Sequence, residues 1–292
     1  MIISVASGKG GTGKTTISTS LALSIEEEHV QFIDCDVEEP NSFIFLKPDN
    51  LQKKSATVLV PEIDKNKCTF CGLCQEICEY NALVVLKDNV LVLPELCHSC
   101  GGCSLLCPEK AISEVDREIG TIEMGKRNNI EIVYGRLNIG EAMPVPLVKM
   151  VKKYIQKTNT VVIDAPPGTS CPVIEAVKDS DYCILVTEPT PFGLNDLKLA
   201  VGIMRELNKP FGVIINRHGM GDSGVEEYCR EENIEILLKV PFEKEIAVAY
   251  SNGIPLVELY PDYKKKFKNI LNMITNIVEE RAKTKIIQER QL

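Results

Sequence analysis

The cysteines are distributed very unevenly along this chain of 292 residues. Eight of the 12 fall in two copies of one spacing, C-x2-C-x2-C-x3-C, and the second copy begins 29 residues after the first. The copies and their similar continuations are Cys68–Cys78 with Asn81–Leu83, and Cys97–Cys107 with Lys110–Ile112. The chain starts with strand-like residues and not with a signal peptide, so we expect a cytoplasmic location and reduced cysteines. Cysteines at such intervals then indicate metal binding rather than disulfides.

Outside this segment, apolar runs rich in Val and Ile alternate with helix-like stretches. The expected strands are Ile2–Ala6, Val30–Ile33, Val161–Ile163, Cys183–Val186, Gly212–Ile215 and Ile236–Val240. The expected helices include Lys14–Glu26, Leu194–Leu207, Ser223–Glu232 and a core-facing terminal helix from Lys264 that frays after about Arg281. Strands with little polar alternation suit a parallel sheet that is covered on both faces. The pattern predicts an α/β fold with a doubly wound, mostly parallel sheet.

The cysteine-rich segment interrupts this alternation. We expect residues 1–60 and 118–292 to form one discontinuous domain, and residues 61–117 to form a small α+β domain inserted into it. Within the insert, Leu83–Leu86 and Val90–Leu93 flank a short polar turn, which predicts a β-hairpin.

Charge and hydropathy exclude several classes of partner. The chain has 33 basic and 41 acidic residues, a formal net charge of −8, so nucleic acid is not expected as a partner. No apolar run approaches the ~18 residues of a membrane span, which makes a membrane partner unlikely on sequence grounds.

A glycine-rich loop follows the first expected strand. Residues Gly8–Thr15 fit G-x-x-x-x-G-K-[ST] between a strand and a helix, the context that a phosphate-binding loop requires. Its backbone N–H groups and the helix N-terminus would bind phosphate oxygens, with Lys14 at the β/γ phosphates and Thr15 on Mg²⁺. The expected ATP-binding residues here are Gly8, Lys9, Gly10, Gly11, Thr12, Gly13, Lys14, Thr15 and Thr16.

The same glycines permit a second interpretation. Gly8, Gly10 and Gly13 also match G-x-G-x-x-G, and Asp34 follows 21 residues after Gly13, as in dinucleotide-binding folds. Lys14 and Thr15 favour the phosphate loop, because a dinucleotide site has no use for a lysine and a hydroxyl there.

With Lys9, the loop resembles the deviant Walker A family, which includes the MinD and ParA ATPases, Mrp-type iron–sulfur carriers and the nitrogenase iron protein. The family pattern K-G-G-x-G-K-[ST] is matched by Lys9–Thr15. The resemblance implies a P-loop ATPase that forms an ATP-dependent homodimer, in which Lys9 reaches the partner's nucleotide. It also implies that Lys9, Lys14 and Asp36 are catalytic. The alternative for Lys9 is an ordinary exposed loop lysine.

Other motifs of this family follow in order. Phe32–Asp36 looks like switch I, which implies that Asp36 orients the attacking water, and Val161–Gly168 resembles Walker B with switch II. By resemblance, the Mg²⁺ residues are Thr15, Asp34, Asp36 and Asp164, and Gly168 lies at the γ-phosphate. Asn216, Arg217, Pro241 and Phe242 resemble the adenine-binding residues. The alternatives are strand-end acids that cap turns and residues that merely form turns.

The cysteine repeat resembles bacterial two-cluster ferredoxins. In these, the fourth cysteine of each run serves the other [4Fe–4S] cluster. This implies Cys68, Cys71, Cys74 and Cys107 on cluster one, and Cys78, Cys97, Cys100 and Cys103 on cluster two. The first run departs from the ferredoxin pattern in one respect. Glu79 follows Cys78, whereas Pro108 follows Cys107 at the equivalent position of the second run. Zinc is the alternative, but structural zinc sites more often use two separated pairs of ligands.

The remaining cysteines have weaker signals. Cys35, Cys183 and Cys229 are expected to be small core or near-surface residues, and His98 a solvated loop residue. Cys171 follows the switch II motif at the offset of the nitrogenase iron protein's cluster cysteine. That protein needs a second cysteine, and Tyr134–Met143 here has none, which favours a plain helix-start cysteine.

Together the motifs predict an ATP-hydrolysing iron–sulfur protein that passes electrons to a redox or iron–sulfur partner with a basic docking face. Two alternatives remain open. The chain could be a scaffold or carrier that hands clusters on, although it lacks the C-terminal C-x-x-C of Mrp-type carriers. It could also be a MinD-like positioning ATPase, which would need an unburied apolar face on its terminal helix.

Overall fold

The computed structural model describes residues 1–25 and 29–289, with side chains as far as Thr284. The chain divides into two compact units, and each is described by itself. The nucleotide unit comprises Met1–Lys53, Ile122–Arg136 and Val148–Leu292, and the cysteine unit comprises Lys54–Thr121 and Leu137–Leu147. The predicted domain limits near residues 60 and 117 fall inside two long strands, β3 (Asp49–Ile63) and β6 (Ile112–Arg127), as does the observed division.

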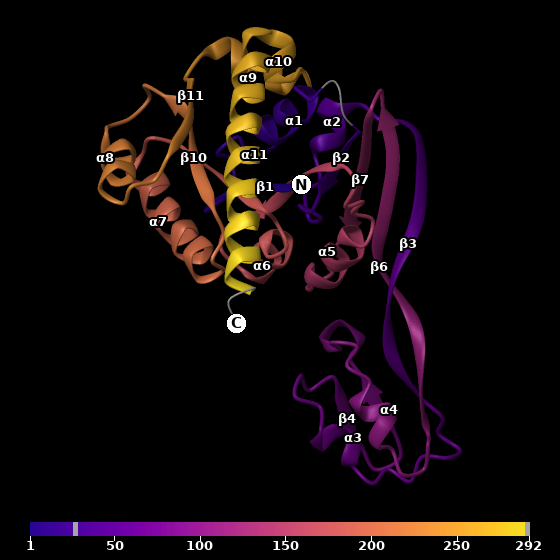
Figure 1. The fold of residues 1–292 in the computed structure, drawn as a ribbon. Helices are drawn as coiled ribbons and strands as arrows, with labels where there is room; N and C mark the ends of the chain where they lie inside the picture. Colours follow the sequence, from indigo (N-terminus) through magenta and orange to yellow (C-terminus); the bar gives the residue numbers. More distant parts are fainter. Residues whose placement is uncertain (26–28, 290–292) are drawn as a thin grey trace. The chain divides into compact units, whose positions relative to one another are not determined.

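The nucleotide unit is built on a parallel sheet (Figure 1). Across the sheet the order is β11 (Ile236–Pro241), β10 (Phe211–His218), β9 (Tyr182–Thr187), β1 (Ile2–Ser7), β8 (Thr160–Pro167), β2 (Val30–Asp34) and β7 (Ile130–Leu137), followed by β6 and β3. All pairs from β11 to β7 are parallel. The predicted doubly wound, mostly parallel fold is therefore confirmed, and the six expected strands correspond to β1, β2, β8, β9, β10 and β11.

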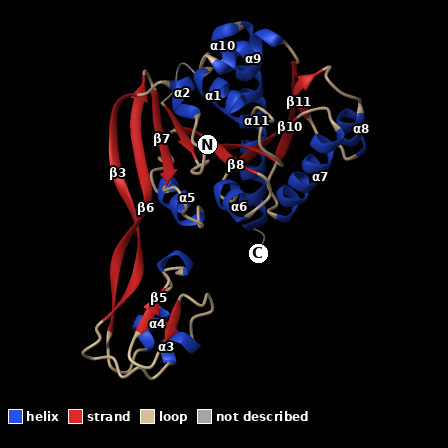
Figure 2. Ribbon diagram, turned by 180° about the vertical axis from the view of Figure 1, so that it is seen from behind, coloured by secondary structure: helices blue, strands red, loops and turns tan. Residues whose placement is uncertain are grey.

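Helices cover both faces of this sheet (Figure 2). They are α1 (Lys14–Leu23), α2 (Ser42–Leu46), α5 (Val145–Lys152), α6 (Cys171–Val177), α7 (Pro191–Glu206), α8 (Gly224–Glu231), α9 (Lys244–Ser251), α10 (Leu256–Leu259) and α11 (Asp262–Glu289). The predicted end of the first helix, Glu26, lies outside the described residues. The terminal helix was expected to fray near Arg281, but α11 continues to Glu289.

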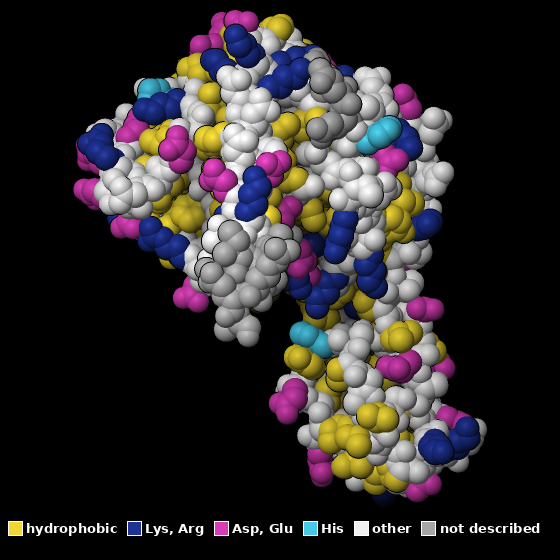
Figure 3. All heavy atoms as spheres, in the orientation of Figure 1, with side chains coloured by type: hydrophobic (Ala, Val, Ile, Leu, Met, Phe, Trp, Pro, Cys, Tyr) yellow, Lys and Arg dark blue, Asp and Glu magenta, His cyan; other side chains and the backbone are white. Residues whose placement is uncertain are grey.

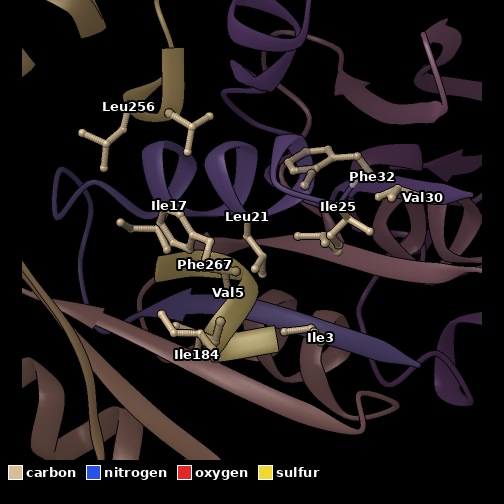
Figure 4. Packing of buried hydrophobic residues seen from close by; sticks show 14 of the residues in the cluster. Ile3, Val5, Ile17, Leu21, Ile25, Val30, Phe32, Ile184, Leu256 and Phe267 are labelled. Carbon is tan, nitrogen blue, oxygen red and sulfur yellow. The ribbon is translucent and has the colours of Figure 1, made fainter. Parts of the chain in front are cut away.

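The main core lies between the sheet and the layer formed by α1, α10 and α11 (Figure 4). Ile17 and Leu21 of α1 and Phe267 of α11 are fully buried against the β1 side chains Ile3 and Val5. Successive strand residues point to opposite faces, so Ser4 and Ala6 face the other layer, where α6 and α7 pack against β1. This packing holds the end of β1, and hence the loop that follows it, in a fixed position.

The cysteine unit repeats one backbone conformation. Its short elements are α3 (Leu73–Glu76), β4 (Leu83–Val85), β5 (Val90–Val92), η1 (Pro94–Leu96) and α4 (Gly102–Leu106). β4 and β5 form the expected hairpin, and α3 packs against α4. Positive φ angles recur at pairs of positions 29 residues apart, namely Phe70 and Ser99, Gly72 and Gly101, and Asn81 and Lys110. The sequence repeat is therefore also a structural repeat.

Among the described residues, no helix is both long enough and apolar enough to cross a membrane.

Candidate functional sites: a phosphate loop and eight cysteines

The glycine-rich loop connects β1 to α1, and two of its glycines are required by close contacts. A Cβ atom on Gly13 would lie 2.2 Å from Asn216 Nδ2, and Gly13 has a φ of +90°. A Cβ atom on Gly8 would lie 2.2 Å from the backbone oxygen of Asp196. Because any larger residue would collide at both positions, the local sequence is fitted to a loop that is packed closely against neighbouring elements.

The first two residues of α1 contact the acidic ends of neighbouring strands. The Lys14 ammonium donates to Asp164 Oδ1 at 3.3 Å and to Asp36 Oδ2 at 3.5 Å. The Thr15 hydroxyl donates to Asp164 Oδ2 at 2.7 Å. Asp34 pairs in register with Asp164 across β2 and β8, so parallel pairing brings these carboxylates to one edge of the sheet. The structure thus brings five of the expected site residues together, namely Lys14, Thr15, Asp34, Asp36 and Asp164.

Burial disturbs the titration of Asp34 and Asp36. Burial, with a smaller contribution from Asp164, raises the pKa of Asp34 to about 7. Burial also raises the pKa of Asp36 to about 6, although Lys14 acts in the opposite direction. The Asp34 carboxylate accepts from the backbone N–H of Asp36 at 3.0 Å and of Ser42 at 3.3 Å. Asp34 therefore orders the loop after β2.

Two further features of the loop region fit a polar ligand. The hydroxyl of Thr12 is buried and has no hydrogen-bond partner, which a bound phosphate would supply. Gly168, after β8, adopts a φ of +95° and donates its N–H to Ser7 O at 3.0 Å. This bond holds the switch-like segment beside the loop.

A cavity of about 240 Å³ opens next to the loop. Its lining comprises Gly11, Gly13, Thr16, Asn216, Arg217, Pro241, Phe242, Glu243, Ile246, Ala247 and Tyr250. The Asn216 amide nitrogen donates to Thr12 O at 2.8 Å, which leaves Asn216 Oδ1 as an acceptor for an exocyclic amino group. The four expected adenine residues thus share one cavity. The contribution of α9, from Glu243 to Tyr250, was not anticipated; the helix-like stretch directly after Phe242 was its available signal.

Lys9 makes contacts within its own chain. Its ammonium donates to Glu188 Oε1, and Arg217 donates to Glu188 Oε2 at 2.8 Å. Burial raises the pKa of Glu188, but Lys9 and Arg217 outweigh it and hold the pKa below its ordinary value. Glu188 therefore binds two residues that were expected to contact nucleotide. In the sequence, Glu188–Gly193 fits the deviant Walker A family and could also merely start a helix, but no local pattern relates Glu188 to Lys9, which lies 179 positions away.

Four cysteines from both runs line one cavity in the cysteine unit. These are Cys68, Cys71, Cys74 and Cys107. Burial raises the pKa of Cys74, and the nearby Cys68 and Cys71 add to the rise. Backbone N–H groups donate to sulfur, from Phe70 to Cys68 Sγ at 3.4 Å and from Ala111 to Cys107 Sγ at 3.3 Å. A half-enclosed set of four thiols with N–H donors fits an iron–sulfur cluster.

The other four cysteines are arranged less compactly. Burial raises the pKa of Cys103, with contributions from Cys97 and Cys100, so these three lie together. Cys78 belongs to the first run, and the ring of Tyr80 stacks on His98 with centroids 3.5 Å apart. This stack brings the end of the first run to the start of the second. His98 is exposed as expected, but it has an aromatic partner that the sequence did not indicate.

The remaining cysteines are free and dispersed. Cys35, Cys183 and Cys229 are buried, as predicted, and Cys171 is exposed at the start of α6. Within residues 1–25 and 29–289, no three His, Cys, Asp or Glu side chains are gathered closely enough to hold a single metal ion.

Comparison with known proteins places the nucleotide unit in a family. The model of the CobQ/CobB/MinD/ParA nucleotide binding domain matches residues 3–256. The chain belongs to this family. Its members bind nucleotide on a P-loop, so the dinucleotide interpretation of the glycines is set aside.

Individual relatives of the CobQ/CobB/MinD/ParA family extend over nearly the whole chain. An uncharacterized protein of Methanocaldococcus jannaschii is 31% identical over 278 residues, which cover 94% of this chain and 97% of that protein. An iron-sulfur cluster carrier protein of the same organism is 24% identical over 295 residues, covering 95% and 84%. The septum site-determining protein MinD of Pyrococcus horikoshii, solved with Mg-ADP, has a TM-score of 0.57 at 20% identity and covers 94% of this chain and 95% of its own. That likeness shows a MinD-like fold.

Proposed function

We propose that this protein is an ATP-hydrolysing iron–sulfur protein, in which ATP-driven dimer switching is coupled to electron transfer through two [4Fe–4S] clusters. The observation that carries the proposal is the presence of Cys107 in one cavity with Cys68, Cys71 and Cys74. This exchange of the fourth ligand between two runs is the pattern of two-cluster ferredoxins.

The donor set favours clusters over a single metal ion. A [4Fe–4S] cluster binds each thiolate to a different iron atom, so its ligands stand farther apart than the four ligands around one zinc ion. The cavity that contains four thiols supports the wider arrangement. Cys68, Cys71, Cys74 and Cys107 would hold cluster one. Cys78, Cys97, Cys100 and Cys103 would hold cluster two, and bound clusters would supply one-electron redox chemistry.

The nucleotide site supplies the residues that ATP hydrolysis needs. Lys14 and Thr15 contact Asp164, so the end of the phosphate loop lies beside one of the acids that we propose to bind Mg²⁺. Asp36 lies beside Lys14 and is the candidate that orients the attacking water. Hydrolysis of this kind depends on positioning and charge stabilisation rather than on a strong base. Lys9 would complete the site of a second copy after it leaves Glu188.

Chain connectivity offers a route for coupling. Tyr134 of β7 pairs in register with Asp34, so β7 ends at the carboxylate edge of the sheet. The chain then enters Leu137–Leu147, which belongs to the cysteine unit. There Glu141 accepts from Arg117 NH1 at 2.6 Å and NH2 at 3.2 Å, and the Glu141 side chain is almost fully buried. A movement at the carboxylate edge of the sheet would thus be passed along the chain to Glu141, which is bound to Arg117 of β6.

The test is a transfer experiment. Protein reconstituted with iron and sulfide without oxygen is mixed with an apo-ferredoxin acceptor, with and without Mg·ATP, and followed by absorbance and EPR. We expect about eight iron atoms per chain, retained throughout. In a parallel mixture, dithionite first reduces the clusters and a redox protein replaces the apo-ferredoxin; we expect ATP-dependent transfer of electrons from the clusters to that protein. Movement of iron into the acceptor would overturn the electron-transfer function.

A carrier function is the second candidate, because relatives in two organisms bear the name iron-sulfur cluster carrier protein. In the same experiment it predicts ATP-dependent iron loss to the acceptor. No observation favours a positioning ATPase, since Tyr263, Phe267 and Ile274 bury the apolar side of α11 in the core.

A further inference from the structure

The structural repeat of the cysteine unit makes its two halves comparable residue by residue. Leu96 precedes the second cysteine run, Leu105 and Leu106 lie within it, and the three side chains are 46%, 84% and 52% exposed. The residues 29 positions earlier in the first run are Lys67, Glu76 and Ile77. The two halves share backbone turns, so this difference lies in their surfaces and not in their fold. Hydrophobic side chains are also seen gathered on the visible face of this unit (Figure 3).

Both halves carry acidic residues, but they differ in their basic residues. Residues 88–109 contain no lysine or arginine, whereas the equivalent residues 59–80 contain Lys65 and Lys67. Acidic side chains accompany the second run: Glu95 precedes Leu96, and a Cβ atom on Gly101 would lie 3.5 Å from Glu114 Oε1. The exposed leucines therefore lie in an acidic surrounding. Leu105 in addition stands between Cys103 and Cys107, one from each proposed ligand set.

We infer that Leu96, Leu105 and Leu106 form the docking face for a one-electron carrier protein that presents an apolar centre ringed by lysine or arginine. The inference rests on the proposed function, because it assumes that the cysteines hold clusters. Apolar contact at the centre supplies affinity, and opposite charge at the rim guides encounter. An anionic bilayer fits poorly, because the acids around the leucines would be repelled by it.

A partner that docks on these leucines lies beside the second cysteine run. After a low-potential one-electron donor has reduced the clusters, one electron passes to the partner's redox centre, which gains the electron that the cluster loses. No bond is made or broken and no proton moves. The first run, with Lys67 and Glu76 in the equivalent places, offers no such face.

The test uses reconstituted holoprotein and a lysine-rich c-type cytochrome as the probe. Anaerobic calorimetry measures its affinity, and stopped-flow absorbance measures its reduction by dithionite-reduced protein. Leu105→Glu copies the first-run residue, and we expect about tenfold weaker binding and about tenfold slower reduction. Leu51→Glu, on another exposed leucine in β3 (52%), and Glu76→Leu should leave both values within about twofold. Affinity should also fall as salt is raised.

The outcomes are distinguishable. Iron content and EPR are measured first, and a protein that binds no iron overturns the proposed function and this inference with it. A Leu105→Glu protein that keeps both clusters and binds the cytochrome as the wild type does overturns the docking face alone. The docking face is also overturned if the wild-type protein forms a dimer, or binds phosphatidylglycerol vesicles, and Leu105→Glu abolishes that interaction. The occupant of the face would then be a second copy or a bilayer.

Discussion

The two units hold their candidate sites in opposite ways. In the nucleotide unit, Lys14, Asp34 and Asp164 are buried and joined to one another and to backbone groups through the ends of packed strands. In the cysteine unit, Cys71 and Cys100 are exposed, the other six run cysteines are half-buried, and the sulfurs are held by local turns. A site built on a sheet edge is organised before its ligand arrives, whereas a site built on turns relies on the ligand itself.

The two units also differ in how many buried hydrophobic side chains they contain. Between Cys68 and Ile112, the fully buried hydrophobic residues are Ala82, Leu83, Val90, Ala111 and Ile112. A segment of this size with so few buried side chains gains little from the hydrophobic effect alone. Bound clusters would take the place of a core there, as metals do in other small domains.

Removal of iron should therefore produce the largest effect. When reconstituted protein is treated with a chelator, residues 68–112 should lose most of their amide hydrogen-exchange protection, while β1 and β8 keep theirs. As a matched pair, Cys107→Ser should lose about half of the iron, since it removes a ligand of one cluster, and Cys229→Ser should lose none. Equal exchange protection with and without iron would break the comparison, because the cysteine unit would then be organised in advance.

Lys14→Ala tests the other side of the comparison. Its loss removes the cation that neutralises Asp164 and Asp36 and would contact the phosphates, so ATPase activity should fall by about 100-fold or more. Iron content should be unchanged, because no cysteine depends on Lys14. A steady-state phosphate-release assay with iron analysis checks both. Lys178→Ala, on a lysine paired only with Glu175 and Asp179 on the surface, is the control and should retain activity.

Most of the strands that the sequence predicted have fully buried Val and Ile runs, whereas β11 was predicted although most of its residues are only partly buried. β3 was missed because its first seven residues, from Asp49 to Ser55, are exposed and, apart from Leu51, polar, so neither an apolar run nor an alternation marks them. β7 was a different omission: Ile130, Ile132 and Val133 are buried and did carry a signal. β7 follows the cysteine-rich segment closely, and no strand was predicted in that part of the sequence.

The candidate sites were predictable where chemistry follows from local spacing. The phosphate loop and the cysteine runs are each contiguous, so their residue types and intervals suffice to mark them. Glu188 and Tyr250 were missed because they reach the site only through the folding of distant elements. The repeat aligned Asn81 with Lys110 in sequence but did not predict that both adopt positive φ, because a lysine carries no signal for that conformation.

Asn216→Asp should give a smaller effect within the nucleotide unit. The variant replaces the N–H donor that contacts Thr12 O with a second acceptor and adds negative charge to the cavity, so ATP affinity should fall by about tenfold. Calorimetry with a non-hydrolysable ATP analogue measures the change. Asn252→Asp, on an exposed amide at the end of α9, serves as the control. Unaltered affinity in Asn216→Asp would show that the preformed contact does not shape the cavity.

The smallest effect should come from Glu188→Gln, which keeps the shape of the side chain and removes its charge. In the absence of a partner, Lys9 and Arg217 are held by Glu188, so a dimer that uses Lys9 in the opposite site must first break that ion pair. Because the Lys9 side chain is 32% exposed, water screens the pair, and its loss should strengthen ATP-dependent association by only about two- to fivefold. Sedimentation with a non-hydrolysable ATP analogue measures this change. Glu226→Gln, which loses similar contacts to His218 and Lys239, should not change it. Weaker association in Glu188→Gln would mean that the Lys9–Glu188 ion pair orients Lys9 for the dimer instead of restraining it. The preorganisation of the nucleotide unit would then include Lys9, the residue that acts in the site of the second copy.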